Sequence, residues 1–278
     1  MFRYSYDALV YSGEPIKASI ERVAKYGYDA IEMLGEPDRF DIREVNQLCR
    51  DNGIKVSSTC SIFTPQRDLV HPDYKVRDHA KEYVRQVVDF TAALGGEKVI
   101  VAPTACSKVA PVADFEEELS WAVENIRECA EYALRSGITI CIESWNRYES
   151  YIAHSLARVL ALVKRIDMPN VGAMGDTFHM NIEEADMAQS LRECGEDLVH
   201  IHLADSNRAA PGAGHIDFEP ILRALLDIGY DGYLTFELLP AGADPFAVMA
   251  QGGCNEFYDK YTEMAINTIK QVEKGLNV

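Results

Sequence analysis

Short apolar runs alternate with longer amphipathic stretches along the whole chain of 278 residues. The amphipathic stretches place apolar residues three and four positions apart, as an α-helix with one buried face does. Several of them end on a glycine, which favours the left-handed conformation found at helix C-termini. The apolar runs are rich in β-branched residues and have the length of buried strands. The expected strands are residues 3–10, 30–34, 55–61, 98–102, 139–144, 171–176, 198–204 and 233–238.

The strand and helix patterns form eight successive units, with no linker rich in proline or glycine between any two of them. Strands that alternate with helices pair as a parallel sheet, and eight such units form a closed barrel. We therefore expect an α/β fold, a (β/α)8 TIM barrel, as a single domain over residues 1–278. An open, doubly wound sheet is the alternative architecture.

The composition is that of a globular enzyme, with 47% hydrophobic and 26% charged residues. Because 44 Asp and Glu outnumber 27 Lys and Arg, the net charge is −17, which argues against nucleic-acid and membrane partners. The first residues show no signal-peptide pattern, and no apolar stretch is long enough to span a bilayer. The seven scattered cysteines indicate reduced thiols, so we expect a cytoplasmic protein.

Four unusual side chains stand at the C-terminal ends of the last four expected strands, where the catalytic groups of a TIM barrel lie. These strand-end residues are Glu143, Asp176, His202 and Glu237. Buried carboxylates are costly without compensation, and no Lys or Arg lies within these strands. Three carboxylates with one imidazole suit Mn²⁺, Mg²⁺ or Co²⁺ better than structural zinc. We therefore predict one divalent metal ion bound by all four. Alternatively, a single Glu here forms a salt bridge and a single His, such as His200, is a core residue.

Three further polar residues follow these strands in the loops: Glu149, His179 and Arg208. Above one metal ion, these loop residues are suited to hydrogen-bond a polyhydroxylated substrate. Trp145 and Phe178 would supply apolar walls. Each of these residues, taken alone, also fits an ordinary surface or packing position.

The segments CIESWNRYES, GDTFHMNIEE, HIHLADSNRAAPGAGHIDF and LTFELL resemble those of the D-tagatose/D-psicose (D-allulose) 3-epimerases, a family among the xylose-isomerase-like sugar isomerase and epimerase barrels. The resemblance extends through nearly the whole chain. It implies that the four strand-end residues bind one divalent ion, commonly Mn²⁺, and that the three loop residues bind the sugar. It also implies that Glu143 and Glu237 transfer the protons, and that the protein is a homodimer or homotetramer.

The residues themselves favour the same reaction. A proton on the carbon next to a ketone is too weakly acidic for an unaided carboxylate, and a metal ion stabilises the enediolate that forms when it leaves. Two glutamates on opposite faces can remove and return the proton, which inverts C3 of a ketose or keto-sugar derivative. The chain departs from the family pattern at three places: Ser144-Trp145, Ala209-Ala210 and the 238–254 loop. These differences leave the identity of the sugar undecided. An inosose or 3-keto-glycoside isomerase or epimerase is therefore the alternative.

Two other functions would use a similar barrel. A DNA-repair endonuclease of the endonuclease IV class needs several extra histidines on strands two to four, where this chain has Glu32, Cys60 and Pro103. The acidic net charge also argues against it. A non-catalytic carbohydrate-binding barrel would keep the polar pocket but would not need both glutamates beside the metal.

Overall fold

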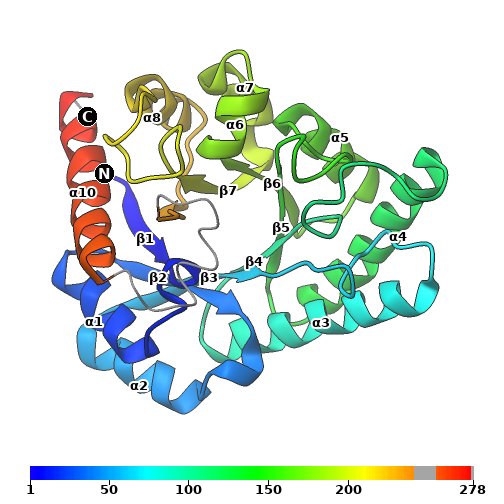
Figure 1. The fold of residues 1–278 in the computed structure, drawn as a ribbon, viewed down its shortest axis with the longest axis horizontal. Coiled ribbons are helices and arrows are strands. Elements are labelled where there is room, and N and C mark those ends of the chain that lie inside the picture. Colours follow the sequence, from blue (N-terminus) through cyan, green and yellow to red (C-terminus); the bar gives the residue numbers. More distant parts are fainter. Residues whose placement is uncertain (241–254, 277–278) are drawn as a thin grey trace.

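Eight strands form a closed barrel in which every neighbouring pair is parallel (Figure 1). The computed structural model describes residues 1–240 and 255–276, so Cys254 and most of the divergent 238–254 loop lie outside the described part. The strands are β1 (Arg3–Asp7), β2 (Ala30–Gly35), β3 (Lys55–Ser61), β4 (Lys98–Val101), β5 (Thr139–Glu143), β6 (Val171–Asp176), β7 (Leu198–Leu203) and β8 (Tyr233–Phe236). The predicted (β/α)8 barrel is confirmed, and all strands but the first end within two residues of the expected positions.

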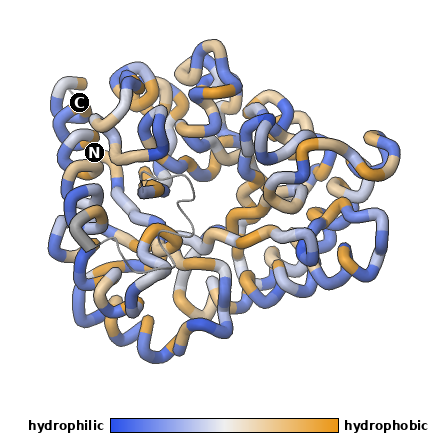
Figure 2. The backbone as a smooth tube through the Cα atoms, in the orientation of Figure 1, coloured by the Kyte–Doolittle hydropathy of each residue, from blue (hydrophilic) through white to orange (hydrophobic). Residues whose placement is uncertain are grey.

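Helices surround the barrel and connect successive strands (Figure 1). Hydrophilic and hydrophobic residues alternate along these outer helices in Figure 2, which is the pattern that predicted them. Helix α2 shows how the sequence sets the ends: Asp41 accepts hydrogen bonds from two backbone N–H groups of the first turn, and Gly53, with φ of 68°, follows the last residue. The helices are α1 (Ile16–Lys25), α2 (Ile42–Asn52), α3 (Tyr74–Ala93), α4 (Phe115–Leu134), α5 (Leu156–Ile166), α6 (Thr177–Glu183), α7 (Met187–Cys194), α8 (Phe218–Asp227) and α10 (Asn255–Gly275). In residues 1–240 and 255–276, no helix has the length and apolar character needed to cross a membrane.

The first strand is shorter than the sequence predicts. It ends at Asp7, and residues Ala8–Tyr11 form a 3-10 helix instead of continuing the strand to residue 10. The Asp7 side chain accepts a hydrogen bond of 2.8 Å from the backbone N–H of Leu9, which caps this short helix. The expectation for the last three residues was wrong because a short apolar run does not distinguish a strand from a tight helical turn.

The interior of the barrel is apolar at one level and polar at the next. Ile100, Cys141 and Met174 form a small buried cluster, separate from the large apolar layer that includes the helices. Side chains two residues apart on a strand point to the same side. Glu143 and Asp176 stand two residues beyond Cys141 and Met174, so they also point into the barrel, above the apolar cluster.

The strand register brings these polar ends to a common region. Asp176 of β6 pairs with His202 of β7. Glu143, the last residue of β5, pairs with Met174, which stands two residues before Asp176 in β6. Glu237 lies two positions beyond the β8 residue that pairs with His202. Strands of a closed barrel are tilted against its axis, so such a stagger places side chains of successive strands at similar heights.

Candidate active site

The four strand-end residues meet at the mouth of the barrel. Glu143 ends β5, Asp176 ends β6, His202 lies in β7, and Glu237 directly follows β8. All four are buried, and each offers a ligand atom within 4.8 Å of the others. His202 Nδ1 lies 3.5 Å from Glu237 Oε2 and 4.0 Å from Glu143 Oε1. The structure therefore brings together the residues that the sequence predicts as metal ligands.

Two atoms of this cluster fit a metal ion especially well. Among the described residues, neither Asp176 Oδ2 nor His202 Nδ1 has a hydrogen-bond partner, although both atoms are buried. Burying polar atoms without a partner costs free energy unless something else compensates for the lost water. Carboxylate oxygens from three residues and one imidazole nitrogen are a suitable donor set for a divalent ion such as Mn²⁺ or Mg²⁺. The residues present therefore fit a divalent metal ion.

The two glutamates differ in their preferred protonation state. Burial raises the pKa of Glu143 to about 8, and the nearby Glu237 carboxylate adds to the shift. Burial also opposes ionisation of Glu237, but the Arg208 guanidinium holds its pKa below the usual range. Asp176 is likewise buried, and its pKa is raised to about 7. At neutral pH these surroundings favour a neutral Glu143 beside an ionised Glu237.

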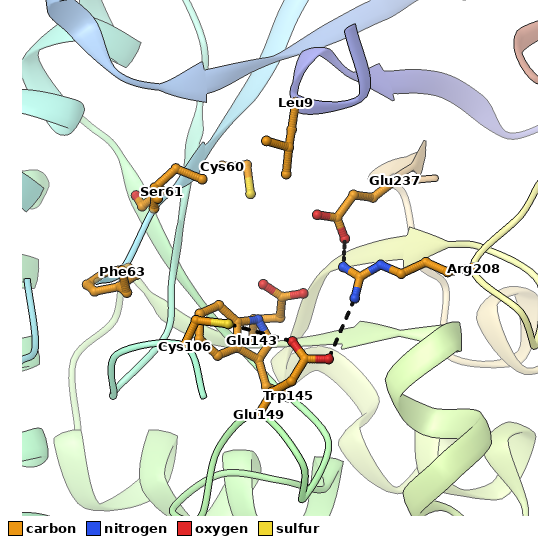
Figure 3. A pocket seen from close by; sticks show the side chains of 11 residues that line it. Leu9, Cys60, Ser61, Phe63, Cys106, Glu143, Trp145, Glu149, Arg208 and Glu237 are labelled. Atoms are coloured by element: carbon orange, nitrogen blue, oxygen red, sulfur yellow. Dashed lines mark hydrogen bonds and ion pairs between the residues drawn. The ribbon is translucent and has the colours of Figure 1, made fainter. Parts of the chain in front are cut away.

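Arg208 reaches over the carboxylates from the loop after β7 (Figure 3). Its Nη2 lies 2.7 Å from Glu237 Oε2 and 4.0 Å from Asp176 Oδ2, and its Nη1 lies 3.8 Å from Glu149 Oε1. The guanidinium carbon stands 4.8 Å from the centre of the Phe178 ring, a cation–π contact. Arg208 has a φ of 61°, and such left-handed conformations of non-glycine residues cluster at functional sites. One cation thus links three carboxylates of the site.

The loop around Arg208 is organised by a buried carboxylate. Asp205 accepts hydrogen bonds from the backbone N–H groups of Gly212 and Ile216, at 2.8 and 3.0 Å. Its own backbone carbonyl accepts from the N–H of Arg208 at 2.8 Å. A side chain at Gly214 would collide with the Asp205 carboxylate, so the close approach requires glycine. These contacts hold the loop in the conformation that directs Arg208 toward the site.

His179, in α6, faces the same carboxylates with its other ring nitrogen. Asn146 donates to His179 Nδ1 from its side-chain amide at 2.7 Å and from its backbone N–H at 3.3 Å. Because Nδ1 accepts, the proton of the neutral ring is on Nε2, which lies 3.7 Å from Asp176 Oδ2 and 4.0 Å from Glu143 Oε1. Burial, and then the charge of Arg208, lower the pKa of His179 and keep the ring neutral. His179 therefore offers an N–H donor and not a lone pair for a metal ion.

A cavity of about 120 Å³ opens beside these groups (Figure 3). It is lined by Leu9, Cys60, Ser61, Ile62, Phe63, Cys106, Glu143, Trp145, Glu149, Arg208 and Glu237. Four of these residues are charged, and Leu9, Ile62, Phe63 and Trp145 give the cavity apolar surface, as in sites for small polar molecules with an apolar face. Trp145 forms part of the wall, as predicted, whereas Phe178 supports Arg208 from beneath.

Three buried polar residues near the site are absent from the sequence prediction: Asp7, Glu32 and Asn146. Asp7 and Cys60 offer ligand atoms within 4.8 Å of each other and of Glu237. Burial, with the charges of Glu32 and Glu237, raises the pKa of Asp7 well above its ordinary value, which favours the neutral acid. Asp7 ends β1 and pairs with Glu32, the third residue of β2. The strand-end rule misses Asp7 because the sequence predicts a first strand that continues to residue 10, and it misses Glu32 because that residue lies within its strand.

A closed (β/α)8 barrel with a candidate metal cluster and a polar cavity at the C-terminal ends of its strands is typical of TIM-barrel enzymes. Residues 20–252 match the model of the xylose isomerase-like TIM barrel family. The chain belongs to this family, within which it resembles the carbohydrate 3-epimerases.

Individual relatives indicate the class of reaction within this family. The chain is 32% identical to D-psicose 3-epimerase of Ruminiclostridium cellulolyticum, over 80% of this chain and 77% of that protein. It is 27% identical to 3-dehydro-D-guloside 4-epimerase of Escherichia coli, over 74% of this chain and 80% of that protein. The crystal structure of D-allulose 3-epimerase from Methylomonas sp. in complex with D-allulose has a TM-score of 0.86 at 28% identity, covering 97% of this chain and 96% of that chain. The protein is therefore an isomerase of the carbohydrate epimerase type.

Proposed function

We propose that this enzyme inverts the carbon next to the ketone, C3, of a ketose or keto-sugar derivative by removing and returning a proton. The observation that carries the proposal is the pair Glu143 and Glu237. The two residues line one cavity from β5 and from the end of β8, strands that are not neighbours. Their pKa values are shifted in opposite directions. Proton exchange on two faces of a substrate needs one carboxylate that accepts and one that donates.

The proposed cofactor is one divalent ion held by the four strand-end residues, with Mn²⁺ as the first candidate and Mg²⁺ or Co²⁺ as alternatives. When bound, the ion supplies positive charge for the ketone oxygen and for the negative charge that develops as the proton leaves. The donor set and the two unpartnered ligand atoms support this assignment.

The chain's own residues then bind the sugar and move the proton. In one direction of the reaction an ionised Glu237 accepts the C3 proton, and a neutral Glu143 gives its proton to the opposite face. The reverse direction exchanges these roles. Arg208 keeps Glu237 ionised and donates hydrogen bonds to substrate oxygens, while His179 donates from Nε2 and Glu149 accepts from a hydroxyl.

Turnover in heavy water tests the proton path. The Mn²⁺-loaded enzyme is incubated with D-fructose, D-psicose and D-tagatose, and the products are analysed by NMR. We expect deuterium at the inverted carbon, because the new proton comes from a carboxylate that exchanges with solvent. Glu143→Gln and Glu237→Gln should each nearly abolish inversion, since an amide does not transfer the proton. Glu118→Gln, a change of a buried carboxylate away from the cavity, is the matched control. A product inverted at C3 without deuterium would contradict the two-glutamate path.

A keto-glycoside is the second candidate substrate. The relationship to the 3-dehydro-D-guloside 4-epimerase of Escherichia coli favours it, because the match extends over 80% of that protein. The same reaction chemistry would then invert the carbon next to the ketone of a glycoside or of an inosose. A screen of free ketoses, inososes and 3-keto-glycosides decides by the ratio of kcat/KM values. Saturable sugar binding with no turnover of any member would indicate a non-catalytic binding protein.

A further inference from the structure

A second polar cluster lies directly beneath the candidate metal site. Glu32, from β2, stands between two histidines of β7: its Oε1 is 2.7 Å from His202 Nε2, and its Oε2 is 2.9 Å from His200 Nε2. At most 1% of each side chain is exposed. Ser58, from β3, also donates to Glu32 Oε2. The cluster is therefore sealed from water and joined by hydrogen bonds.

The donors and acceptors of this cluster determine where the imidazole protons are. A carboxylate only accepts hydrogen bonds, so both histidines must donate to Glu32 from Nε2. Three donors, from His202, His200 and Ser58, converge on the two oxygens of Glu32, and an ionised carboxylate accepts from all of them. With a proton on Nε2, a neutral His202 carries its lone pair on Nδ1. This atom is the one that lies 3.5 Å from Glu237 and 4.0 Å from Glu143.

We propose that Glu32 is a positioning residue for the metal centre: by accepting the Nε2 proton of His202, it fixes the tautomer and ring orientation that present Nδ1 to the ion. This inference rests on the proposed metal site. His200 shares the second carboxylate oxygen of Glu32 and so holds that carboxylate in place. Partners of this kind, behind a metal-binding imidazole, typically change metal affinity about 10- to 100-fold when they are removed.

The substitution Glu32→Gln has a specific effect on this arrangement. Glutamine offers one acceptor oxygen and one NH₂ donor to two imidazoles that both present N–H groups. One of the two rings must therefore move its proton to Nδ1 or lose its hydrogen bond. When that ring is His202, Nδ1 no longer has a free lone pair for the ion. We expect Mn²⁺ to bind about 10- to 100-fold more weakly than to the wild type.

The experiment measures Mn²⁺ affinity and stoichiometry from the electron paramagnetic resonance signal of the free ion. It compares the wild type with Glu32→Gln, Glu32→Asp and Glu118→Gln, and folding is checked by circular dichroism. Glu118→Gln, a buried carboxylate outside both clusters, should bind Mn²⁺ like the wild type. Glu32→Asp keeps the negative charge but withdraws the carboxylate by one methylene, so affinity should still fall. If Glu32→Asp binds Mn²⁺ as tightly as the wild type and only Glu32→Gln binds it more weakly, the negative charge of Glu32 is what matters. That result would contradict a positioning role.

A second measurement does not depend on any variant folding. In the wild type with [¹⁵N]histidine and saturating Mg²⁺, NMR should show His202 protonated on Nε2 and bound through Nδ1. Metal bound through Nε2, or two ions per chain, would place an ion between Glu32 and the histidines and overturn the inference. If the wild type binds Mn²⁺ and Glu32→Gln binds it equally well, the inference alone fails. A wild type that binds no divalent ion defeats the proposed metal site itself, and this inference with it.

Discussion

Asp176→Asn separates the role of one side chain in folding from its role in metal binding. In the structure one carboxylate oxygen of Asp176 caps α6, accepting from the backbone N–H of Phe178 at 2.8 Å. The other, Oδ2, is buried without a hydrogen-bond partner among the described residues and is the proposed metal ligand. Asparagine keeps an oxygen for the cap and replaces Oδ2 by an NH₂ group, which does not bind a cation. The variant should therefore fold normally and lose one metal ligand.

The expected size of the effect follows from linkage. An ion present at one hundred times its Kd stabilises the folded state by about 2.7 kcal/mol. For a chain of 278 residues, with an unfolding entropy of about 2.1 cal/mol/K per residue, this corresponds to a rise in Tm of about 5 °C. The wild type should show this rise with excess Mn²⁺. Asp176→Asn should show little or none of it at the same concentration.

With chelator present, the variant should be the more stable of the two proteins. The pKa of Asp176 is raised to about 7 in the folded protein. When the pKa of a carboxyl group is higher in the folded protein than in the unfolded chain, its contribution to stability is fully present at low pH. This contribution is lost as the pH rises through the pKa of the folded protein. At pH 8 the ionised carboxylate costs up to about 4 kcal/mol, which the neutral amide avoids. In chelator at pH 8, Asp176→Asn should therefore unfold at a higher temperature than the wild type.

Thermal unfolding followed by circular dichroism, with chelator or with excess Mn²⁺, measures both effects in one set of samples. Asp217→Asn is the matched control, because Asp217 caps α8 away from the cavity. It should keep the full Mn²⁺-dependent rise. The reasoning is refuted if Asp176→Asn gains as much from Mn²⁺ as the wild type does, or if it unfolds below the wild type in chelator at pH 8.

Three further predictions follow from the site and its surroundings. Metal analysis should find about one divalent ion per chain, and chelation should remove activity that added Mn²⁺ restores; full activity after exhaustive chelation would exclude the metal mechanism. Alanine at Arg208, His179 or Glu149 should raise KM or lower kcat with the metal content intact, since these groups position substrate; loss of metal in His179→Ala would make that residue a ligand. Lys108→Met should destabilise the fold by about 3 to 5 kcal/mol in chemical denaturation. The buried carboxylate of Glu118, 2.9 Å from Lys108 Nζ, would lose its cation. An unchanged denaturation midpoint would contradict this.

Some expectations from the sequence stay predictions. They are the cytoplasmic location, the homodimer or homotetramer, and the extent of one domain over residues 1–278. The identity of the ion and of the sugar also stay proposals, to be decided by the metal analysis and the substrate screen.

The architecture and the positions of the candidate ligands follow from local patterns in the sequence. Alternation of apolar runs with amphipathic stretches is a local pattern, and eight repeats of it leave few arrangements other than a closed parallel barrel. Within a strand, side chains alternate between two faces, so the spacing of Glu143 and Asp176 from apolar neighbours already directs both into the barrel. For these residues, position along the strand was sufficient.

The charge and the tautomer of the individual groups depend on contacts that form only in the folded barrel. Glu32 and His202 are 170 positions apart, and their hydrogen bond depends on the register of strands that meet only when the barrel closes. The same is true of Arg208 beside Glu237 and of Asn146 donating to His179, contacts that set the charge of one group and the tautomer of the other. Sequence patterns report which face a side chain occupies. The choice of hydrogen-bond partner depends on differences of a few tenths of an ångström in the distance between two side chains. When these side chains come from distant segments, the packed fold alone fixes that distance.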